Sequence, residues 1–243
     1  MSNYTLITGA TSGIGFEMAK YLSVNRRLLL VGRDTEKLRH SIESLKFPER
    51  HKSILVDLNA DRGALYNLLT DYIVSNGIEV DSFIHCAGAT KILPLKNFDI
   101  ESIDRIFNVN LFSAIEIIKA LLRKHNHFAL QNIIFISSLW SIRGQKGNSM
   151  YASSKGAINS LVYSLSKELA PKIRVNAILP GAVETPMTAD VMNGEYGKAE
   201  LKDYPLGYGK CSDIVNSVEF LLSDKARWIT GQTISVDGGR SIL

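Results

Sequence analysis

Short apolar runs alternate with longer amphipathic segments along this 243-residue chain, and that alternation constrains its fold more than any other feature. Most runs are continuously apolar, so both faces of each strand are predicted to be buried, as in a parallel sheet. The expected strands are Tyr4–Thr8, Arg27–Val31, Ser53–Asp57, Ser82–His85, Asn132–Ser137, Arg174–Leu179 and Thr233–Val236.

The segments between these strands carry apolar residues three and four positions apart, which is the spacing of an amphipathic helix. The expected helices are Ile14–Ser23, Asp34–Leu45, Asp61–Ser75, Ile103–His125, Tyr151–Leu169 and Asp213–Ser223. Alternating strands and helices with right-handed crossovers predict an α/β fold, a Rossmann-type doubly wound parallel sheet of about seven strands flanked by helices. No linker or repeat divides the chain, so residues 1–243 are predicted to form one domain.

Residues 187–209 interrupt the alternation with glycines, Pro205 and many polar residues. A connection of this length between a strand and a helix is typical of a lid or binding loop. We therefore predict a substrate lid here. The alternative is a surface excursion with a short helix around Met187–Asn193.

Composition excludes several classes of protein. Hydrophobic residues make up 45% of the chain, too many for a disordered protein, and no apolar run approaches the ~20 residues of a membrane span. The amino terminus enters a strand pattern at Tyr4, so we expect no leader sequence. Cys86 and Cys211 provide neither a disulfide framework nor metal-ligand spacing, so we expect a cytoplasmic protein without a metal site. The net charge of +4 comes from scattered residues and indicates no nucleic-acid partner.

A glycine-rich turn links the first expected strand to the first expected helix and reads Gly9-Ala-Thr-Ser12-Gly13-Ile14-Gly15. Glycines at such a turn allow the backbone to approach a pyrophosphate closely. The amides and dipole of the helix start then favour a bound phosphate. This position in the chain predicts a dinucleotide site, with a purely structural tight turn as the alternative.

Tyr151 and Lys155 lie four residues apart in a predicted helix, which places them on one face. A tyrosine with a reference pKa of ~10 needs a fall of roughly 3 pH units to exchange a proton near neutrality. An ammonium group about 4 Å away supplies the required ~4 kcal/mol at an effective dielectric of about 20. Ser138 follows a predicted strand at the carboxyl edge of the sheet, where α/β enzymes place their sites.

These motifs together resemble the short-chain dehydrogenase/reductase family over nearly the full chain, with Ser138 thirteen residues before Tyr151. The resemblance implies that Tyr151 exchanges the proton and Ser138 hydrogen-bonds the substrate oxygen. It implies that Lys155 lowers the pKa of the tyrosine and holds the nicotinamide ribose, and that Asn110 positions a water. Ser137 and Asn108 remain the alternatives to Ser138 and Asn110.

The end of the second strand bears on the choice between NAD and NADP. NAD-binding sites place an acidic residue near this point, whereas this chain reads Gly32-Arg33-Asp34. By resemblance Arg33 takes the place of the basic residue of NADP-preferring relatives, and a guanidinium suits a 2′-phosphate. NADP(H) is therefore favoured. NAD(H) is the alternative, with Asp34 turned inward. Asp57 and Leu58 match the family's adenine contact.

The same resemblance assigns further cofactor contacts. Ala87 and Gly88 permit close approach of the cofactor, Val183 holds the carboxamide through its backbone, and Thr185 contacts the pyrophosphate. Where most relatives read Asn-Asn before Ala87, this chain reads His85-Cys86. The amide side chains usual there brace the sheet, so the replacement lowers the expected local stability or cofactor affinity.

By pattern the chain looks most like the 3-oxoacyl-(acyl-carrier-protein) reductases of this family, in part through Pro205-Leu-Gly-Tyr-Gly. The resemblance implies reduction of a carbonyl to a secondary alcohol or the reverse, with 3-oxoacyl thioesters as the leading substrate. It also implies a homotetramer or homodimer, and an acyl carrier protein as a candidate partner. A sugar, polyol or hydroxysteroid dehydrogenase is the alternative within the family, and a non-catalytic NADP(H)-sensing regulator is the alternative outside enzymes.

Overall fold

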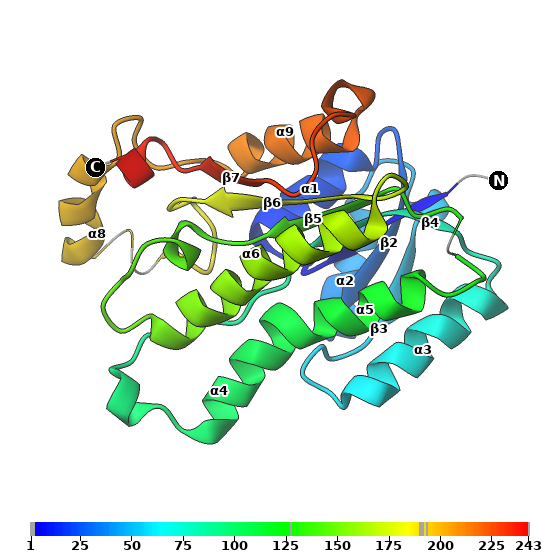
Figure 1. Ribbon diagram of the computed structural model, residues 1–243, viewed down its shortest axis with the longest axis horizontal. Coiled ribbons are helices and arrows are strands. Elements are labelled where there is room, and N and C mark those ends of the chain that lie inside the picture. The colour runs from blue at the N-terminus through cyan, green and yellow to red at the C-terminus, as the bar shows by residue number, and fades with distance from the viewer. Residues whose placement is uncertain (1–2, 127, 190–191, 193, 243) are drawn as a thin grey trace.

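A seven-stranded parallel sheet forms the centre of the protein in the computed structural model (Figure 1). The structure describes residues 3–126, 128–189, 192 and 194–242. The strands are β1 (Tyr4–Thr8), β2 (Arg27–Gly32), β3 (Lys52–Leu55), β4 (Val80–His85), β5 (Asn132–Ile136), β6 (Arg174–Pro180) and β7 (Thr233–Val236). Every neighbouring pair is parallel. The predicted α/β class and doubly wound sheet are confirmed.

The strand order β3-β2-β1-β4-β5-β6-β7 places the switch point of the sheet between β1 and β4. From β1 the chain winds outward through β2 and β3, and from β4 it winds outward in the other direction. Ligands of open α/β sheets bind in the crevice outside the carboxyl ends of the strands at such a point. Thr8 and His85, the last residues of β1 and β4, are register partners there.

Helices cover both faces of the sheet. The longer ones are α1 (Gly13–Leu22), α2 (Thr35–Glu43), α3 (Arg62–Ser75), α4 (Ile100–Phe107), α5 (Ser113–Leu121), α6 (Ser149–Leu169), α8 (Glu195–Glu200) and α9 (Cys211–Leu222). Short 3₁₀ turns lie at Pro48–Arg50, Leu95–Asn97, Leu139–Ser141, Leu201–Asp203, Asp224–Ala226 and Arg240–Ile242. No helix among the described residues is long and apolar enough to cross a membrane.

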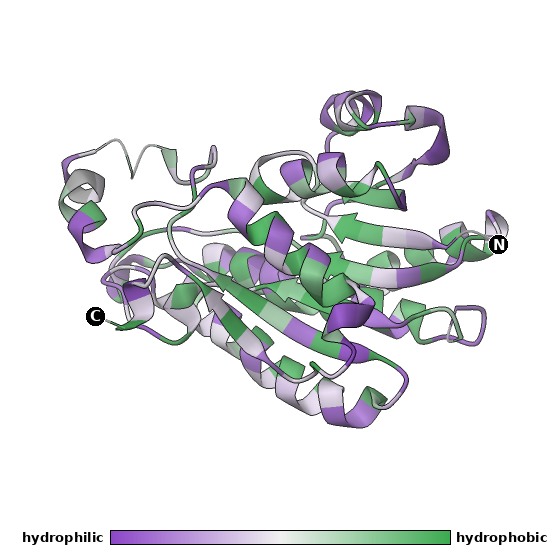
Figure 2. Ribbon diagram, turned by 90° about the horizontal axis from the view of Figure 1, so that it is seen from above, coloured by the Kyte–Doolittle hydropathy of each residue, from purple (hydrophilic) through white to green (hydrophobic). Residues whose placement is uncertain are grey.

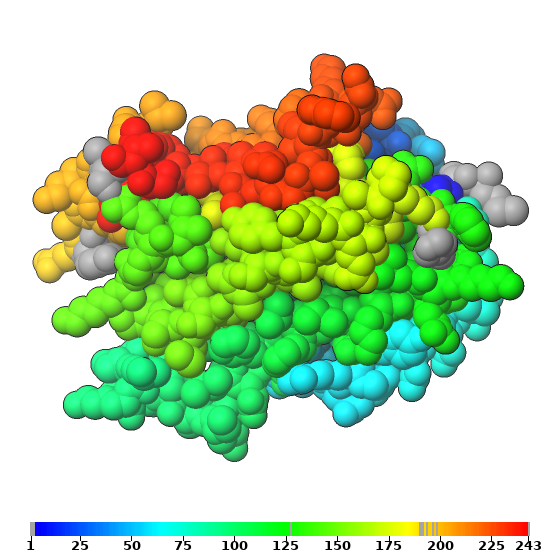
Figure 3. Space-filling view, viewed as in Figure 1, coloured from blue at the N-terminus to red at the C-terminus, as the bar shows by residue number. Residues whose placement is uncertain are grey.

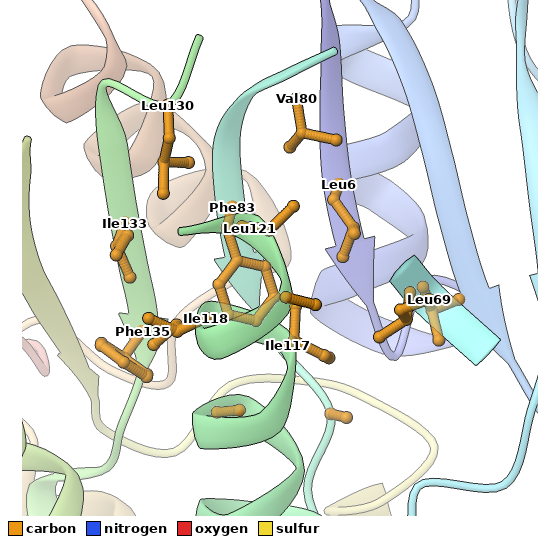
Figure 4. Packing of buried hydrophobic residues seen from close by; sticks show 14 of the residues in the cluster. Leu6, Leu69, Val80, Phe83, Ile117, Ile118, Leu121, Leu130, Ile133 and Phe135 are labelled. Atoms are coloured by element: carbon orange, nitrogen blue, oxygen red, sulfur yellow. The ribbon is translucent and has the colours of Figure 1, made fainter. Parts of the chain in front are cut away.

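The two faces of the sheet bury separate hydrophobic clusters. One cluster packs the strands against α3, α5 and α6, and Figure 4 shows Phe83 of β4 beside Leu6, Ile117 and Leu121 within it. The other packs the strands against α1, α2 and α9. Successive side chains of a strand point to opposite faces, so Leu6 and Ile7 enter different clusters, and both are fully buried. This two-sided burial is why the strands read as continuous apolar runs.

The outer surfaces of the covering helices face solvent. Figure 2 shows hydrophobic residues concentrated on the strands and hydrophilic residues on the outward sides of the helices. In the space-filling view, the segments of α6, α4–α5 and α3 run side by side as bands across one face (Figure 3). The segment with α8 and the chain end after β7 lie at the end of the molecule toward which the strands point (Figure 1).

The expected helix Ile103–His125 differs most from the structure. It begins earlier, at Ile100, because the Asp99 carboxylate accepts a hydrogen bond from the backbone of Ser102 at 2.6 Å. A π-helical turn over Asn108–Phe112 then separates α4 from α5. The helix ends at Leu121, where the buried side chain of Asn126 donates to the Leu121 carbonyl. The apolar spacing continues through the π turn, so periodicity could not show the break.

Smaller differences concern element ends. β3 ends at Leu55, so Asp57 lies two residues beyond the strand it was expected to finish. The last helix before β6 starts at Ser149, two residues before Tyr151. Within 187–209 the structure places α8 and the Leu201–Asp203 turn, while residues 190, 191 and 193 of the expected lid lie outside the described residues.

Candidate functional site

Two adjoining hollows lie along the carboxyl edge of the sheet, over the switch point. They share five lining residues, namely Gly9, Thr11, Ser12, Ala87 and Gly88. The inner hollow extends over β5 and β6 and is also lined by Gly13, Ile14, Gly15, Ser138, Tyr151, Lys155, Val183 and Thr185. The outer hollow extends toward β2 and β3 and is also lined by Arg33, Asp57, Leu58, Arg105 and Val109. Together they form one elongated groove.

The glycine-rich turn forms the floor between the two hollows. Gly9 has a φ of +69°, and a Cβ atom there would lie only 2.7 Å from the backbone nitrogen of Ala87. A Cβ atom on Gly15 would overlap the carbonyl oxygen of Gly9. Helix α1 starts one residue after Ser12, whose side chain makes no capping hydrogen bond. The amides of the helix start are therefore open toward the groove, as an anion site requires.

The outer hollow holds the residues expected to select the cofactor. Arg33 lies with its guanidinium 3.9 Å from the Asp57 carboxylate, and both side chains are about half exposed. Asp34 caps α2 by accepting a hydrogen bond from the backbone of Lys37 at 3.0 Å, so it does not turn inward. A side chain on Gly32 would contact Leu38 at 3.0 Å, which leaves little space for a carboxylate at that position.

Tyr151 and Lys155 lie one turn apart in α6, on the wall of the inner hollow. The Lys155 ammonium lies 5.9 Å from the centroid of the tyrosine ring and donates to the carbonyl of Ile136 at 2.7 Å. Ser138 follows the end of β5 and hydrogen-bonds the Tyr151 phenol through its side chain. Ser137 instead donates to Asn159 at 2.8 Å. The structure thus brings Ser138, and not Ser137, to the phenol.

Burial governs the protonation of this group of residues. It lowers the pKa of Lys155 to about 8, because the apolar surroundings disfavour the charged ammonium. Burial also raises the pKa of Tyr151, and the hydrogen bond with Ser138 opposes that shift only in part. The sequence led us to expect a lowered pKa for Tyr151, whereas in this structure burial makes the net shift of its pKa upward.

Asn110 occupies the π turn behind the groove and is fully buried. Its amide accepts from the backbone of Ala89 at 2.7 Å and donates to Ser154 of α6 at 2.9 Å. A Cβ atom on Gly88 would lie 3.7 Å from both the Asn110 amide oxygen and the Lys155 nitrogen. Asn110 therefore lies immediately behind the site, although it does not line either hollow. Asn108 contacts Arg62 on the outside of the turn.

The segment after β6 closes the inner hollow over the glycine-rich turn. The Thr185 side chain lies 3.3 Å from the position of a Cβ atom on Gly13. Thr188 ties this segment together, because its hydroxyl accepts from the backbone of Thr185 at 3.1 Å and donates to the carbonyl of Val183. Tyr204 accepts a hydrogen bond from the backbone of Ala182 at 3.2 Å.

Several lining residues were not among the individual site residues expected from the sequence. Met187 and Thr188, the first two residues of the expected lid, line the inner hollow, and Arg105 of α4 lines the outer one. The lid prediction covered residues 187–209 but singled out neither residue. No local pattern in the sequence shows that Arg105 borders the groove.

Comparisons with known proteins agree with this geometry. A family model described as Enoyl-(Acyl carrier protein) reductase matches residues 9–241. The 3-oxoacyl-(acyl-carrier-protein) reductase FabG of Rickettsia felis is 33% identical over 238 residues, covering 97% of this chain and 95% of the relative. The match spans the glycine-rich turn, both hollows and α6.

Solved structures show the same fold. A crystal structure from Brucella melitensis, described as a short-chain dehydrogenase/reductase and glucose/ribitol dehydrogenase, superposes with a TM-score of 0.88. It is 31% identical and covers 98% of this chain and 96% of its own. The structure of 4-hydroxyisoleucine dehydrogenase complexed with NADH is 26% identical, covers 100% of both chains and has a TM-score of 0.88.

Proposed function

This chain belongs to the short-chain dehydrogenase/reductase family, and we propose that it reduces a carbonyl to a secondary alcohol with NADP(H), or runs the reverse reaction. Membership makes it an NAD(P)-dependent oxidoreductase acting on CH–OH or C=O groups. The observation that carries the proposal is the meeting of Tyr151, Lys155 and Ser138 on the wall of a groove whose floor is a glycine-rich turn.

The groove fits a dinucleotide at each of its parts. The close backbone approach at Gly9 and the open start of α1 suit the pyrophosphate, with Thr185 across from them. Ala87 and Gly88 line the groove at the switch point, and Asp57 and Leu58 line the outer hollow, which supports their proposed contact with the adenine. Val183 lines the inner hollow, which supports the proposal that its backbone holds the carboxamide.

Arg33 supports NADP(H) over NAD(H). Arg33 lines the outer hollow, where its guanidinium lies beside the half-exposed carboxylate of Asp57. Breaking such an exposed ion pair to bind a phosphate costs little free energy. Asp34, the acid that an NAD site would use, is committed to capping α2. A fork of N–H donors beside the ribose matches a 2′-phosphate.

The chain's own residues divide the work on the substrate. Tyr151 gives a proton to the carbonyl oxygen or takes one from the alcohol, while Ser138 hydrogen-bonds the same oxygen. Lys155 holds the ribose hydroxyls, and Asn110 keeps the floor behind Gly88 in place for the water that joins the lysine to solvent. The bound nicotinamide supplies or accepts the hydride.

We propose a 3-oxoacyl thioester as the substrate and an acyl carrier protein as the partner that delivers it. Support comes from relatives named for this reaction at about one-third identity over nearly the whole chain. Residues 187–209 act as the lid over the substrate in a homotetramer or homodimer. The name of the Brucella melitensis structure favours a sugar or polyol as the second candidate.

The decisive experiment follows the loss of NADPH absorbance with acetoacetyl thioesters, simple ketones and keto-sugars side by side. The proposal expects the thioester to give the highest kcat/KM. A keto-sugar as the best substrate would replace the thioester assignment and leave the reaction class intact. NADPH binding without oxidation by any member of the panel would point to a nucleotide-sensing regulator and overturn the proposal.

A further inference from the structure

The tail of the chain, residues 237–242, follows β7 and packs behind the inner hollow. A Cβ atom on Gly181, which lines that hollow, would lie 2.8 Å from the Cα atom of Asp237. The Asp237 carboxylate accepts a hydrogen bond from the backbone of Ser241 at 2.8 Å, which folds the tail into a compact turn. Arg240 extends from this turn with its side chain only 17% exposed. The tail thus carries a largely buried cation next to the site.

The guanidinium of Arg240 contacts the second part of the expected lid, residues 201–208, which we call the lid turn. It lies 3.2 Å from the Asp203 carboxylate, and its central carbon lies 5.8 Å from the centroid of the Tyr204 ring. Both charged side chains are partly shielded from water, which strengthens their attraction. One arginine therefore holds two successive residues of the lid turn.

The backbones of the tail and the lid turn are also in contact. The backbone of Leu206 donates to the carbonyl of Gly238 at 3.1 Å. A Cβ atom on Gly238 would lie 2.9 Å from the carbonyl oxygen of Gly207, and one on Gly239 would lie 3.1 Å from the Pro205 ring. The two glycines of the tail therefore allow the close approach that brings the next side chain to the lid turn.

A further contact joins the tail to the loop that carries Ser138. The Arg143 guanidinium donates to the backbone carbonyl of Arg240 at 2.5 Å. The backbone of Arg143 donates to the carbonyl of Leu139 at 3.2 Å, within the short turn that Ser138 caps by accepting from the backbone of Trp140. Arg240 thus links the lid turn, through its side chain, to the Ser138 loop, through its backbone.

Tyr204 connects the lid turn to another wall of the inner hollow. Its side chain is buried, and its hydroxyl accepts a hydrogen bond from the backbone of Ala182 at 3.2 Å. The next residue, Val183, lines the hollow and forms a β-bridge with Gly209. A displacement of the Tyr204 ring would therefore move the chain that forms this wall.

We propose that Arg240 is a positioning residue, which holds the lid turn at a fixed distance from the Ser138 loop and so keeps the shape of the inner hollow for the substrate. It acts through Asp203 and Tyr204 on one side and through Arg143 on the other. The proposal rests on the proposed function, because that function assigns the inner hollow to the substrate.

Four variants separate this role from a general loss of stability. Arg240→Met keeps an unbranched side chain and removes the guanidinium. Asp203→Asn removes the charge of its partner, and the double variant tests whether the two side chains act as one unit. Arg26→Met is the matched control, because Arg26 forms a similarly shielded ion pair with Asp81 at 3.5 Å, at the amino ends of β2 and β4 and away from the groove.

The kinetic constants are measured with whichever acetoacetyl thioester, ketone or keto-sugar the parent reduces best. We expect the KM to rise about five- to tenfold in Arg240→Met, which loses the ion pair and the ring contact together, and about threefold in Asp203→Asn. The kcat and the Kd for NADPH should change less than about twofold, because loss of uniform substrate binding raises the KM alone.

The double variant should have the same KM as Arg240→Met, since the second substitution removes a contact that is already lost. Arg26→Met should keep the parental KM. The proposal is overturned by a parental KM in Arg240→Met, by an equal rise in Arg26→Met, or by effects that multiply in the double variant.

Amide hydrogen exchange tests the same link without turnover. Exchange at the amides of Leu206 and Gly207 should be at least about threefold faster in Arg240→Met. Arg143→Met, which releases the tail from the Ser138 loop, should also speed their exchange, whereas Arg26→Met should not. Parental exchange in Arg240→Met or in Arg143→Met would overturn the proposal. If the parent reduces no carbonyl compound, the proposed function is wrong, and the exchange rates still decide the role of Arg240.

Discussion

The ammonium group of Lys155 donates to the backbone carbonyl of Ile136 at 2.7 Å, on the wall of the inner hollow. This contact ties the ammonium to the end of β5, while its nitrogen lies 5.9 Å from the centroid of the Tyr151 ring. Burial lowers the pKa of the lysine to about 8 and raises the pKa of the tyrosine. The protein alone therefore holds the two groups close together with the proton still on the tyrosine.

Cofactor binding should weaken as the pH rises through about 8. Below that value Lys155 is charged and is a strong donor to ribose hydroxyls, whereas above it the neutral amine donates weakly. We expect the Kd for NADPH to rise about fivefold between about pH 7 and about pH 9. Fluorescence titration measures it. Lys155→Met should bind more weakly and without this pH dependence, and equal slopes in the two proteins would contradict the assignment.

His85 should make the protein less stable in acid. Burial lowers its pKa from 6.5 to about 3. Between these pH values the unfolded chain binds a proton at His85 that the folded chain does not. The contribution of His85 to the free energy of unfolding is therefore complete above pH 6.5 and falls as the pH decreases toward about 3. The slope is at most about 1.4 kcal/mol per pH unit.

Urea unfolding at about pH 5 and about pH 7 tests this linkage. His85→Gln removes the titrating ring, so the loss of stability between the two values should be smaller in the variant than in the parent. Both proteins should still lose some stability between the two pH values, because burial also lowers the pKa of His51. An unchanged difference would show that His85 does not contribute.

Removal of the Arg33 guanidinium should weaken NADPH binding selectively. A charge-assisted hydrogen bond contributes about 1.5–3 kcal/mol, so Arg33→Ala should raise the Kd for NADPH about tenfold or more. The Kd for NADH should change less than about twofold. Lys37→Ala is the control, since Lys37 is an exposed cation 3.9 Å from Asp34 on the adjoining helix. Equal losses for NADPH and NADH would contradict the preference for NADP(H).

A methyl group on Gly9 should abolish cofactor binding. Its Cβ atom would lie 2.7 Å from the Ala87 nitrogen, so the end of β4 must move out of register with the turn. Gly77→Ala is the matched control, because Gly77 also has a positive φ and has nothing within 4 Å of its added Cβ atom. That variant should lose about 1 kcal/mol of stability and keep the parental Kd for NADPH.

The sequence allowed the prediction of every strand and of most of the groove, because these features are encoded by neighbouring residues. Burial on both faces leaves continuous apolar runs such as Leu28–Val31, and a phosphate-binding turn needs its glycines in one short stretch. The positions of Tyr151 and Lys155 follow from helical spacing, and the structure places both on one wall of the inner hollow.

Features that depend on distant partners were not predictable. The π turn is held by Asn110 bonding to Ala89, 21 positions earlier, and its helix ends where Asn126 bonds to Val80. The raised pKa of Tyr151 was missed for a related reason, since spacing along a helix does not reveal the carbonyl toward which Lys155 points. Each of these contacts joins residues that are distant in the sequence, so it exists only once the sheet and its covering helices have assembled.

The central claim is that the Tyr151 phenol exchanges the proton of the reacting oxygen. Tyr163→Phe is the control for its substitution, because Tyr163 lies in the same helix, half exposed, with its hydroxyl near Thr233. The direct measurement is kcat for thioester reduction in Tyr151→Phe together with its Kd for NADPH. The account predicts a kcat lower by about 10²–10⁴-fold with a Kd within about threefold of the parent. A variant that turns over as fast as the parent and Tyr163→Phe would contradict it.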